Sequence, residues 1–375
     1  MAEIHEKWLA REGSASGSFA TDPDEEKRLV RLASAFLGCE DVETGFTHPG
    51  LCLTVLPYRA LRPDQEWRRI SPAMTLSVQP LRDAEGRMRG VPYGSKARLI
   101  LLFLQSEAVR TASPEIELGT SMHAWLKKLD ISAGGKTYDQ VSEQADRIAS
   151  CVLTFTYRGP SGDTHWQDSI VRGSFDPRAR RGDRVVRLSE TFFHALRDRP
   201  TPVNIAAVRL LGDRCAALDI YLWLAYRLHS LKSQRLVGWP ALHAQFGANT
   251  KQLWHFKPRF LRELKAAVAV YPEAQVTVEE RGLLLVPSPP PAAVSLVSPR
   301  RRPADAAAPA LPVLAAPRPA GTGPTVASAA AQGDLLAAIV PAAPASSGDL
   351  AKVQTRPSAP AKPGKRAGPT RRPPR

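Results

Sequence analysis

The sequence predicts an α+β protein with two tandem winged-helix domains, each a helix-turn-helix followed by a β-hairpin, and a disordered C-terminal tail. Three observations support this class. Residues 95–175 follow the order helix, extended piece, helix, turn, helix, hairpin. The same order of elements returns about 119 residues later as a repeat of pattern with little shared identity. The composition also changes abruptly after Val286.

The segment ahead of the first repeat predicts one helix and a small layer of strands. Apolar residues recur at helical spacing through 25–37, and Gly38 is suited to end the helix. Residues 51–58 and 73–78 read as strands, and the second is followed by a turn at 83–86. Residues 1–25 are polar and predict a mobile arm.

The first repeat has a helix with Ser95 as its cap, a short extended piece, two further helices and two strands. These elements are expected at 95–109, 115–118, 120–129, 136–150, 152–157 and 166–175. The second repeat has its elements at 216–231, 236–238, 239–246, 250–268, 275–280 and 282–286. Pro258 should kink or shorten the last of its helices.

The composition sets the expected boundaries: an arm at 1–25, a first winged-helix domain with added strands at 26–185, a second at 186–286, and a tail at 287–375. The tail holds 19 of the 34 prolines and 12 Lys/Arg against 3 Asp/Glu, and it has no aromatic residue. Such a segment buries too little apolar surface to offset its chain entropy.

The whole chain carries a net charge of +15, which fits a polyanionic partner but also a merely solvated basic surface. The four cysteines form no C-x-x-C motif and indicate reduced thiols. The N-terminus lacks an apolar signal segment, and no apolar run is long enough to span a membrane. We therefore expect a cytoplasmic protein with no membrane partner.

Several motifs resemble the plasmid-encoded RepA replication proteins, over roughly residues 51–286. They are Val-Pro-Tyr-Gly-Ser at 91–95, the run 98–109, Ile-Glu-Leu-Gly at 116–119, Arg-Leu-Ser-Glu-Thr-Phe-Phe at 187–193, and Ala-Leu-Asp-Ile-Tyr-Leu-Trp-Leu-Ala-Tyr-Arg at 217–227. The resemblance implies sequence-specific binding to double-stranded origin DNA, duplex opening, and recruitment of host replication proteins such as the helicase and the host initiator. These are packing motifs, so they specify the family's fold and not a chemical step.

The first recognition helix, at 136–150, departs from the family pattern because it carries three acids, Asp139, Glu143 and Asp146. With Val141, Ala145 and Ile148 facing the core, the candidate DNA-binding residues are Lys136, Thr137, Gln140, Gln144 and Arg147. Further candidates are Arg158 at the wing and Arg178, Arg180 and Arg181 in a basic loop, which could equally be a solvated loop.

The second recognition helix favours DNA binding more strongly because no acid precedes Glu263. With Leu253, Phe256, Phe260 and Leu264 inward, the outward candidates are Asn249, Lys251, Gln252, His255, Arg259 and Arg262. Trp254 could be a core residue or a stacking residue.

No catalytic, metal-binding or cofactor-binding motif is present: the eight histidines form no ligand pair and there is no Walker A sequence. The protein is therefore expected not to be an enzyme. The alternatives are a dimeric winged-helix transcriptional regulator, and a DNA nicking enzyme with an unrecognised site. The segment Gln-Gly-Asp-Leu-Leu at 332–336 loosely resembles a sliding-clamp-binding peptide, although an accidental apolar patch in the tail is the simpler interpretation.

Overall fold

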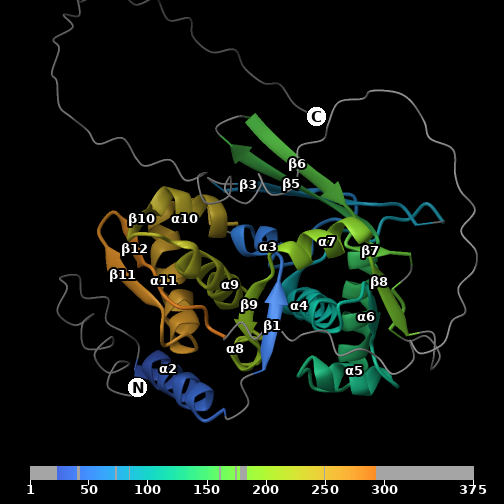
Figure 1. Ribbon diagram of the computed structural model, residues 1–375, viewed down its shortest axis with the longest axis horizontal. Helices are drawn as coiled ribbons and strands as arrows, with labels where there is room; N and C mark the ends of the chain where they lie inside the picture. The colour runs from blue at the N-terminus through green and yellow to red at the C-terminus, as the bar shows by residue number, and fades with distance from the viewer. Residues whose placement is uncertain are drawn as a thin grey trace, which may run out of the picture. The chain divides into compact units, whose positions relative to one another are not determined.

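The computed structural model describes residues 23–39, 43–71, 74–83, 85–159, 162–173, 175–177, 184–248 and 250–292. Its helices are α2 (Pro23–Leu37), α3 (Pro49–Leu53), α4 (Gly94–Thr111), α5 (Met122–Lys128), α6 (Gly135–Ala149), α7 (Glu190–Asp198), α8 (Ile205–Leu210), α9 (Cys215–Ser230), α10 (Trp239–Phe246) and α11 (Leu253–Ala269). Helices and sheets are both well represented, so the expected α+β class is confirmed (Figure 1). No described helix is long and apolar enough to cross a membrane.

The strands of the described residues form four antiparallel sheets of two to four strands. They are β1 (Thr44–Thr47), β2 (Trp67–Ile70), β3 (Met74–Pro80), β4 (Glu115–Glu117), β5 (Cys151–Gly159), β6 (Gly162–Asp168), β7 (Val171–Arg172), β8 (Val185–Leu188), β9 (Thr201–Asn204), β10 (Arg235–Gly238), β11 (Gln275–Glu279) and β12 (Gly282–Val286). The sheet orders are β1-β9, β2-β3-β5-β6, β4-β8-β7 and β10-β12-β11.

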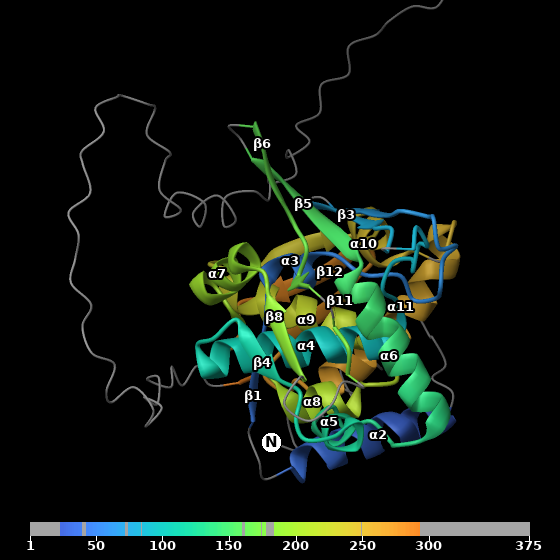
Figure 2. The same cartoon turned by 90° about the vertical axis from the view of Figure 1, so that its right-hand side faces the viewer.

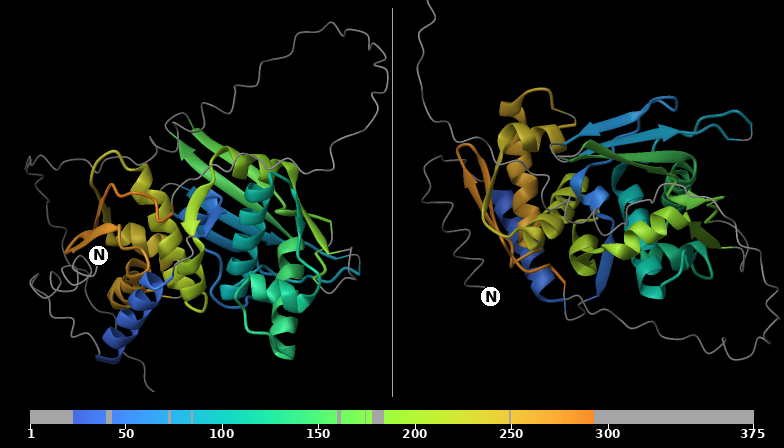
Figure 3. Two further views of the ribbon diagram at one scale, coloured as in Figure 1. Left: turned by 60° about the horizontal axis from the view of Figure 1, so that its bottom comes forward. Right: turned by 45° about the horizontal axis from the view of Figure 1, so that its top comes forward.

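The N-terminal layer differs from expectation at α3, and it contains two strands, β1 and β2, that the sequence does not predict. The strand expected at 51–58 is wrong, because Pro49–Leu53 forms the short helix α3. His48 starts this helix: its Nδ1 accepts the Gly50 N–H at 3.1 Å, and Pro49 follows it in the first helical turn. The helix α2 begins at Pro23 and packs against α8 and α11, as Figure 3 also shows.

The first repeat, α4 to β6, has the expected helices, with boundaries shifted by a few residues. Ser121 caps α5 by accepting the Ala124 N–H at 3.0 Å. Ser95 does not cap α4, because the helix starts one residue earlier and its cap position is Tyr93. The strand expected at 166–175 is divided into β6 and β7, and these join different sheets.

In the first repeat, the strand between the helices, β4, does not pair with the hairpin of the same repeat. The hairpin β5–β6 extends the sheet of β2 and β3 and projects away from the helices (Figure 2). The strand β4 pairs instead with β8, where Ile116 lies opposite Val186 and both are buried. In the second repeat, β10 pairs with β12 of its own hairpin, so that repeat completes a three-stranded sheet.

One continuous cluster of buried apolar side chains runs through both repeats. Inside it, the guanidinium of Arg98 on α4 makes two hydrogen bonds of 2.7 Å to the carboxylate of Asp219 on α9. Each is the fifth residue of its helix, so the two repeats meet at corresponding positions. Burial opposes the charge on Arg98, but the adjacent carboxylate outweighs this effect and raises the pKa of Arg98. Burial also raises the pKa of Asp219 against the effect of the Arg98 charge, so each group depends on the other to stay ionised inside the core.

Candidate nucleic-acid interface

The N-terminal half of α11 presents polar and cationic side chains to solvent. Phe256, Phe260 and Leu264 are buried, as their spacing predicts. The residues expected to face outward do so where they are described, and all of them are exposed: Lys251, Gln252, His255, Arg259 and Arg262. Asn249 lies outside the described residues. Pro258 sits inside the helix, which continues to Ala269.

The charge on this face is cationic over its first three turns. Residues 251–262 include no acid. Glu263 comes next, and its carboxylate accepts from Arg262 at 3.1 Å and from Arg214 at 3.0 Å. Arg214 also reaches Glu25 of α2 at 3.4 Å. The acid is therefore neutralised where α2 covers the helix, and the exposed N-terminal part is suited to phosphate.

A series of hydrogen bonds connects β2, α10 and the loop that leads into α11. On one side, Arg69 of β2 donates to the carbonyl oxygens of His243 and Gln245, each at 2.8 Å. On the other side, the His243 Nε2 lies 2.6 Å from the Thr250 carbonyl oxygen. Gly247 is required between them, because a Cβ there would collide with the side chain and carbonyl of His243. The loop before α11 is thus positioned from the first sheet.

The helix α6 is less suited to DNA than its sequence predicts. Lys136 is exposed, and Thr137 and Gln140 are half-buried. The outward orientation expected of Gln144 and Arg147 is wrong, because both side chains are buried. The Gln144 Oε1 accepts the Tyr93 N–H at 2.9 Å, and Arg147 donates to the Val91 carbonyl at 3.1 Å.

These two side chains hold the segment that enters α4. Tyr93 is the cap residue of α4, so Gln144 satisfies a backbone N–H at the helix start. Gly90 has φ +81°, and a Cβ there would collide with the Arg147 guanidinium. Arg147 also pairs with Glu143 at 2.9 Å and lies over the Tyr93 ring. Residues 144 and 147 therefore pack the Pro-Tyr-Gly-Ser segment instead of facing solvent.

The remaining sequence candidates are only partly described. Arg158 lies near the tip of the β5–β6 hairpin, with its backbone paired to Asp163. Arg178, Arg180 and Arg181, the arm at 1–22 and the clamp-like segment at 332–336 lie outside the described residues. Within the described ranges, no group of three or more His, Cys, Asp or Glu side chains could hold a metal ion.

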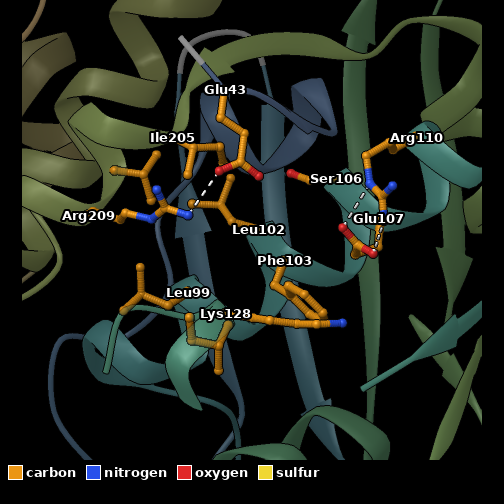
Figure 4. Close-up of a pocket in the computed structure, with 12 residues that line it drawn as sticks. Glu43, Leu99, Leu102, Phe103, Ser106, Glu107, Arg110, Lys128, Ile205 and Arg209 are labelled. Atoms are coloured by element: carbon orange, nitrogen blue, oxygen red, sulfur yellow. Dashed lines mark hydrogen bonds and ion pairs between the residues drawn. The ribbon is translucent and has the colours of Figure 1, made fainter. Parts of the chain in front are cut away.

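A cavity of about 350 Å³ lies away from both helices, between α4, α5 and α8 (Figure 4). Its floor includes Leu99, Leu102 and Phe103. Four of its charged side chains form two ion pairs, Glu43 with Arg209 at 2.9 Å and Glu107 with Arg110, and Lys128 lies over the Phe103 ring. Because each of these two pairs is neutral, the lining keeps only the positive charge of Lys128.

Three residues that hold other elements in place, Arg69, Arg98 and Asp219, are not predicted as such from the sequence. Arg69 carries no sequence signal, because its partners are backbone carbonyls 174 and 176 residues away. Arg98 and Asp219 lie within the quoted motifs, and their equal positions in α4 and α9 could have paired them. Trp254, for which the sequence allows either a core or a stacking role, is exposed.

A comparison with known protein families matches the first repeat and the beginning of the second. Residues 91–239 match the family model described as plasmid encoded RepA protein, a span from the segment before α4 to the start of α10. The chain is thus related to a class of plasmid-encoded proteins. These residues, which include the motifs at 91–95 and 217–227, are similar to the RepA family, and the expected resemblance is confirmed over this span. The helix α11 lies beyond the matched residues.

Two solved structures of RctB domains 2 and 3 are similar to this chain. A selenomethionine derivative shares 12% identity with a TM-score of 0.39, covering 64% of this chain and 95% of the other. A second structure of these domains shares 12% identity with a TM-score of 0.32, covering 63% and 94%. No curated protein matches the sequence.

Proposed function

We propose that this protein is a plasmid replication initiator that binds double-stranded origin DNA sequence-specifically. The observation that carries the proposal is the exposed, acid-free N-terminal half of α11, in a chain whose residues 91–239 are similar to the RepA family. Helices that read DNA place their N-terminal residues against base edges in the major groove. Lys251, Gln252 and Arg259 supply donors for phosphate and bases there.

Both repeats are proposed to act as winged helix-turn-helix units. The second supports this directly, because α10, a Gly-containing turn and α11 are followed by the β11–β12 hairpin paired to β10. The first has the same order of elements, with a hairpin that joins a different sheet. We assign α11 the larger share of specificity, since Gln144 and Arg147 of the α6 candidates are buried and Thr137 and Gln140 are half-buried.

Hydroxyl-radical footprinting of the full chain on an origin fragment tests this function. A protomer that engages both repeats should protect about two helical turns, roughly 20 bp. Protection of one half-site per protomer would instead support a dimeric regulator whose second subunit reads the other half. Absence of any specific footprint would contradict sequence-specific binding altogether.

The protein is further proposed to act by binding energy without breaking a covalent bond in DNA. Duplex opening would follow from deformation at flexible steps that the bound state stabilises, and host helicase, initiator and clamp would then be recruited. Supercoiled origin plasmid incubated with the protein and Mg²⁺ or Mn²⁺ should stay supercoiled. Accumulation of open circles that is lost in a specific Tyr or Asp variant would identify a nicking enzyme instead.

A further inference from the structure

The most exposed large apolar side chain of the described residues lies on the outward side of α11. Trp254 is 66% exposed, whereas the inward aromatic residues of the same helix, Phe256 and Phe260, are 4% and 3% exposed. The core of the second repeat is therefore complete without it. Leaving an indole in water forgoes a large burial free energy, and exposed apolar surface of this kind marks an interaction site when other features support it.

The surroundings of Trp254 point to an anionic partner. Its indole lies against the imidazole of His255, with ring centroids 3.3 Å apart. Lys251 precedes it just before the helix and Pro258 follows it one turn later, and both are exposed. Arg259 continues the neighbouring row. The face thus has an apolar row of Trp254 and Pro258 beside a row of donors, with no carboxylate in residues 251–262.

We propose that Trp254 reads a thymine through its C5 methyl group in the major groove. The inference rests on the proposed function, because it requires α11 to enter that groove. Inside a duplex the faces of the bases are stacked and closed to an indole. The edges that a recognition helix meets are polar except for the thymine methyl, which is the apolar group displayed in the major groove. Trp254 and Pro258 form an apolar row of matching character, and the cations beside them hold the flanking phosphates.

Selection from random duplexes about 25 bp long, enough for two helical turns, identifies the bound site for the full chain and for Trp254→Ala. The wild type is expected to require thymine at one position where Trp254→Ala shows no base preference. Uracil in place of that thymine removes only the methyl group. It should weaken wild-type binding about fourfold, the value of one buried methyl, and leave Trp254→Ala unchanged.

Two variants control for folding and for general loss of apolar surface. Trp254→Phe keeps a flat apolar ring and should retain the discrimination between thymine and uracil. Leu81→Ala truncates another exposed apolar residue, far from α11 in sequence, and should behave as wild type. Circular dichroism of each variant verifies the fold.

The outcomes separate this inference from the proposed function. If wild type selects a site but uracil costs it and Trp254→Ala equally at every thymine, the thymine contact is overturned while specific binding stands. Loss of affinity confined to single-stranded DNA in Trp254→Ala would also overturn it, in favour of stacking on unpaired bases. If no site is selected, both proposals fall.

Discussion

The two repeats contain the same order of elements but bury their last helices differently. The helix α11 leaves its N-terminal half open, while α6 turns Gln144 and Arg147 inward to hold the start of α4. The strand partners also differ between the repeats. The strand β10 pairs with β12 of the hairpin in its own repeat, whereas β4 pairs with β8, which lies outside the first hairpin. The same order of elements therefore leaves polar side chains of the last helix open in one copy and uses two of them for packing in the other.

The largest effect is expected where the two repeats touch. Asp219→Asn should destabilise the protein by about 3–5 kcal/mol, because it leaves the buried Arg98 charge without its partner. Urea unfolding monitored by circular dichroism measures this loss. The double variant Arg98→Met with Asp219→Leu should recover much of the stability, since it removes both charges. A single variant as stable as wild type would show that the contact between repeats is not held by this pair.

His48, in the layer ahead of the first repeat, should make the free energy of unfolding decrease at acidic pH. Burial lowers the pKa of His48 from 6.5 to about 4. Between those values the unfolded chain binds a proton that the fold excludes, so stability falls as the pH drops from about 6.5 to about 4. This effect amounts to about 3 kcal/mol. His48→Asn keeps an acceptor for the Gly50 N–H and should flatten the dependence in urea titrations at several pH values. An unchanged slope in that variant would assign the effect elsewhere.

The functional difference between the two helices is tested by paired substitutions. Arg259→Ala with Arg262→Ala should weaken binding to an origin fragment by about 1–3 kcal/mol for each side chain that reads a base. Lys136→Ala with Gln140→Ala on α6 should cost less, because that helix offers fewer accessible donors and three acids. Mobility-shift titrations at fixed salt give both values. Equal losses of affinity would mean that the two helices contribute alike.

The loop before α11 is held in place, through α10, by Arg69 of β2. Arg69→Met removes two hydrogen bonds to α10 carbonyls and should weaken DNA binding without itself touching DNA. Charge-assisted bonds of this kind contribute about 1.5–3 kcal/mol at most, and part of the loss will appear as stability. Comparison with Arg68→Met, the exposed neighbour on the same strand, separates this positioning from a change in net charge. Similar titrations for both variants would remove Arg69 from the binding machinery.

The smallest effect concerns the residues after the second repeat. The described chain continues to Ala292, with Ser288 buried and the Pro289 carbonyl accepting from Tyr271 at 2.6 Å. Truncation after Ala292 should therefore keep the fold and the specific site. It removes 12 Lys/Arg and 3 Asp/Glu, so log K against log salt should become less steep. An unchanged salt slope would mean that this segment does not contact phosphate.

Sequence periodicity located the helices well and the strand partners poorly. The faces of α11 followed from the spacing of Phe256, Phe260 and Leu264, because one side of that helix is open to water. The faces of α6 did not, since long polar side chains such as Arg147 can reach inward to a backbone carbonyl. Likewise, the alternation in β4 and β8 shows that each buries one face, but it contains no information about which strands pair.

The pairing of β1 with β9 has a consequence for how the protein is made. Thr44 lies opposite Asn204, so β1 cannot pair until a strand about 160 residues further along the chain has been synthesised. At a synthesis rate of roughly 5–20 residues per second, this delay is on the order of 10–30 s. During translation β1 and α2 emerge before any of the surfaces that α8, β9 and α11 provide. The pairing of β1 and the packing of α2 are therefore completed only after β9 and α11 have been synthesised.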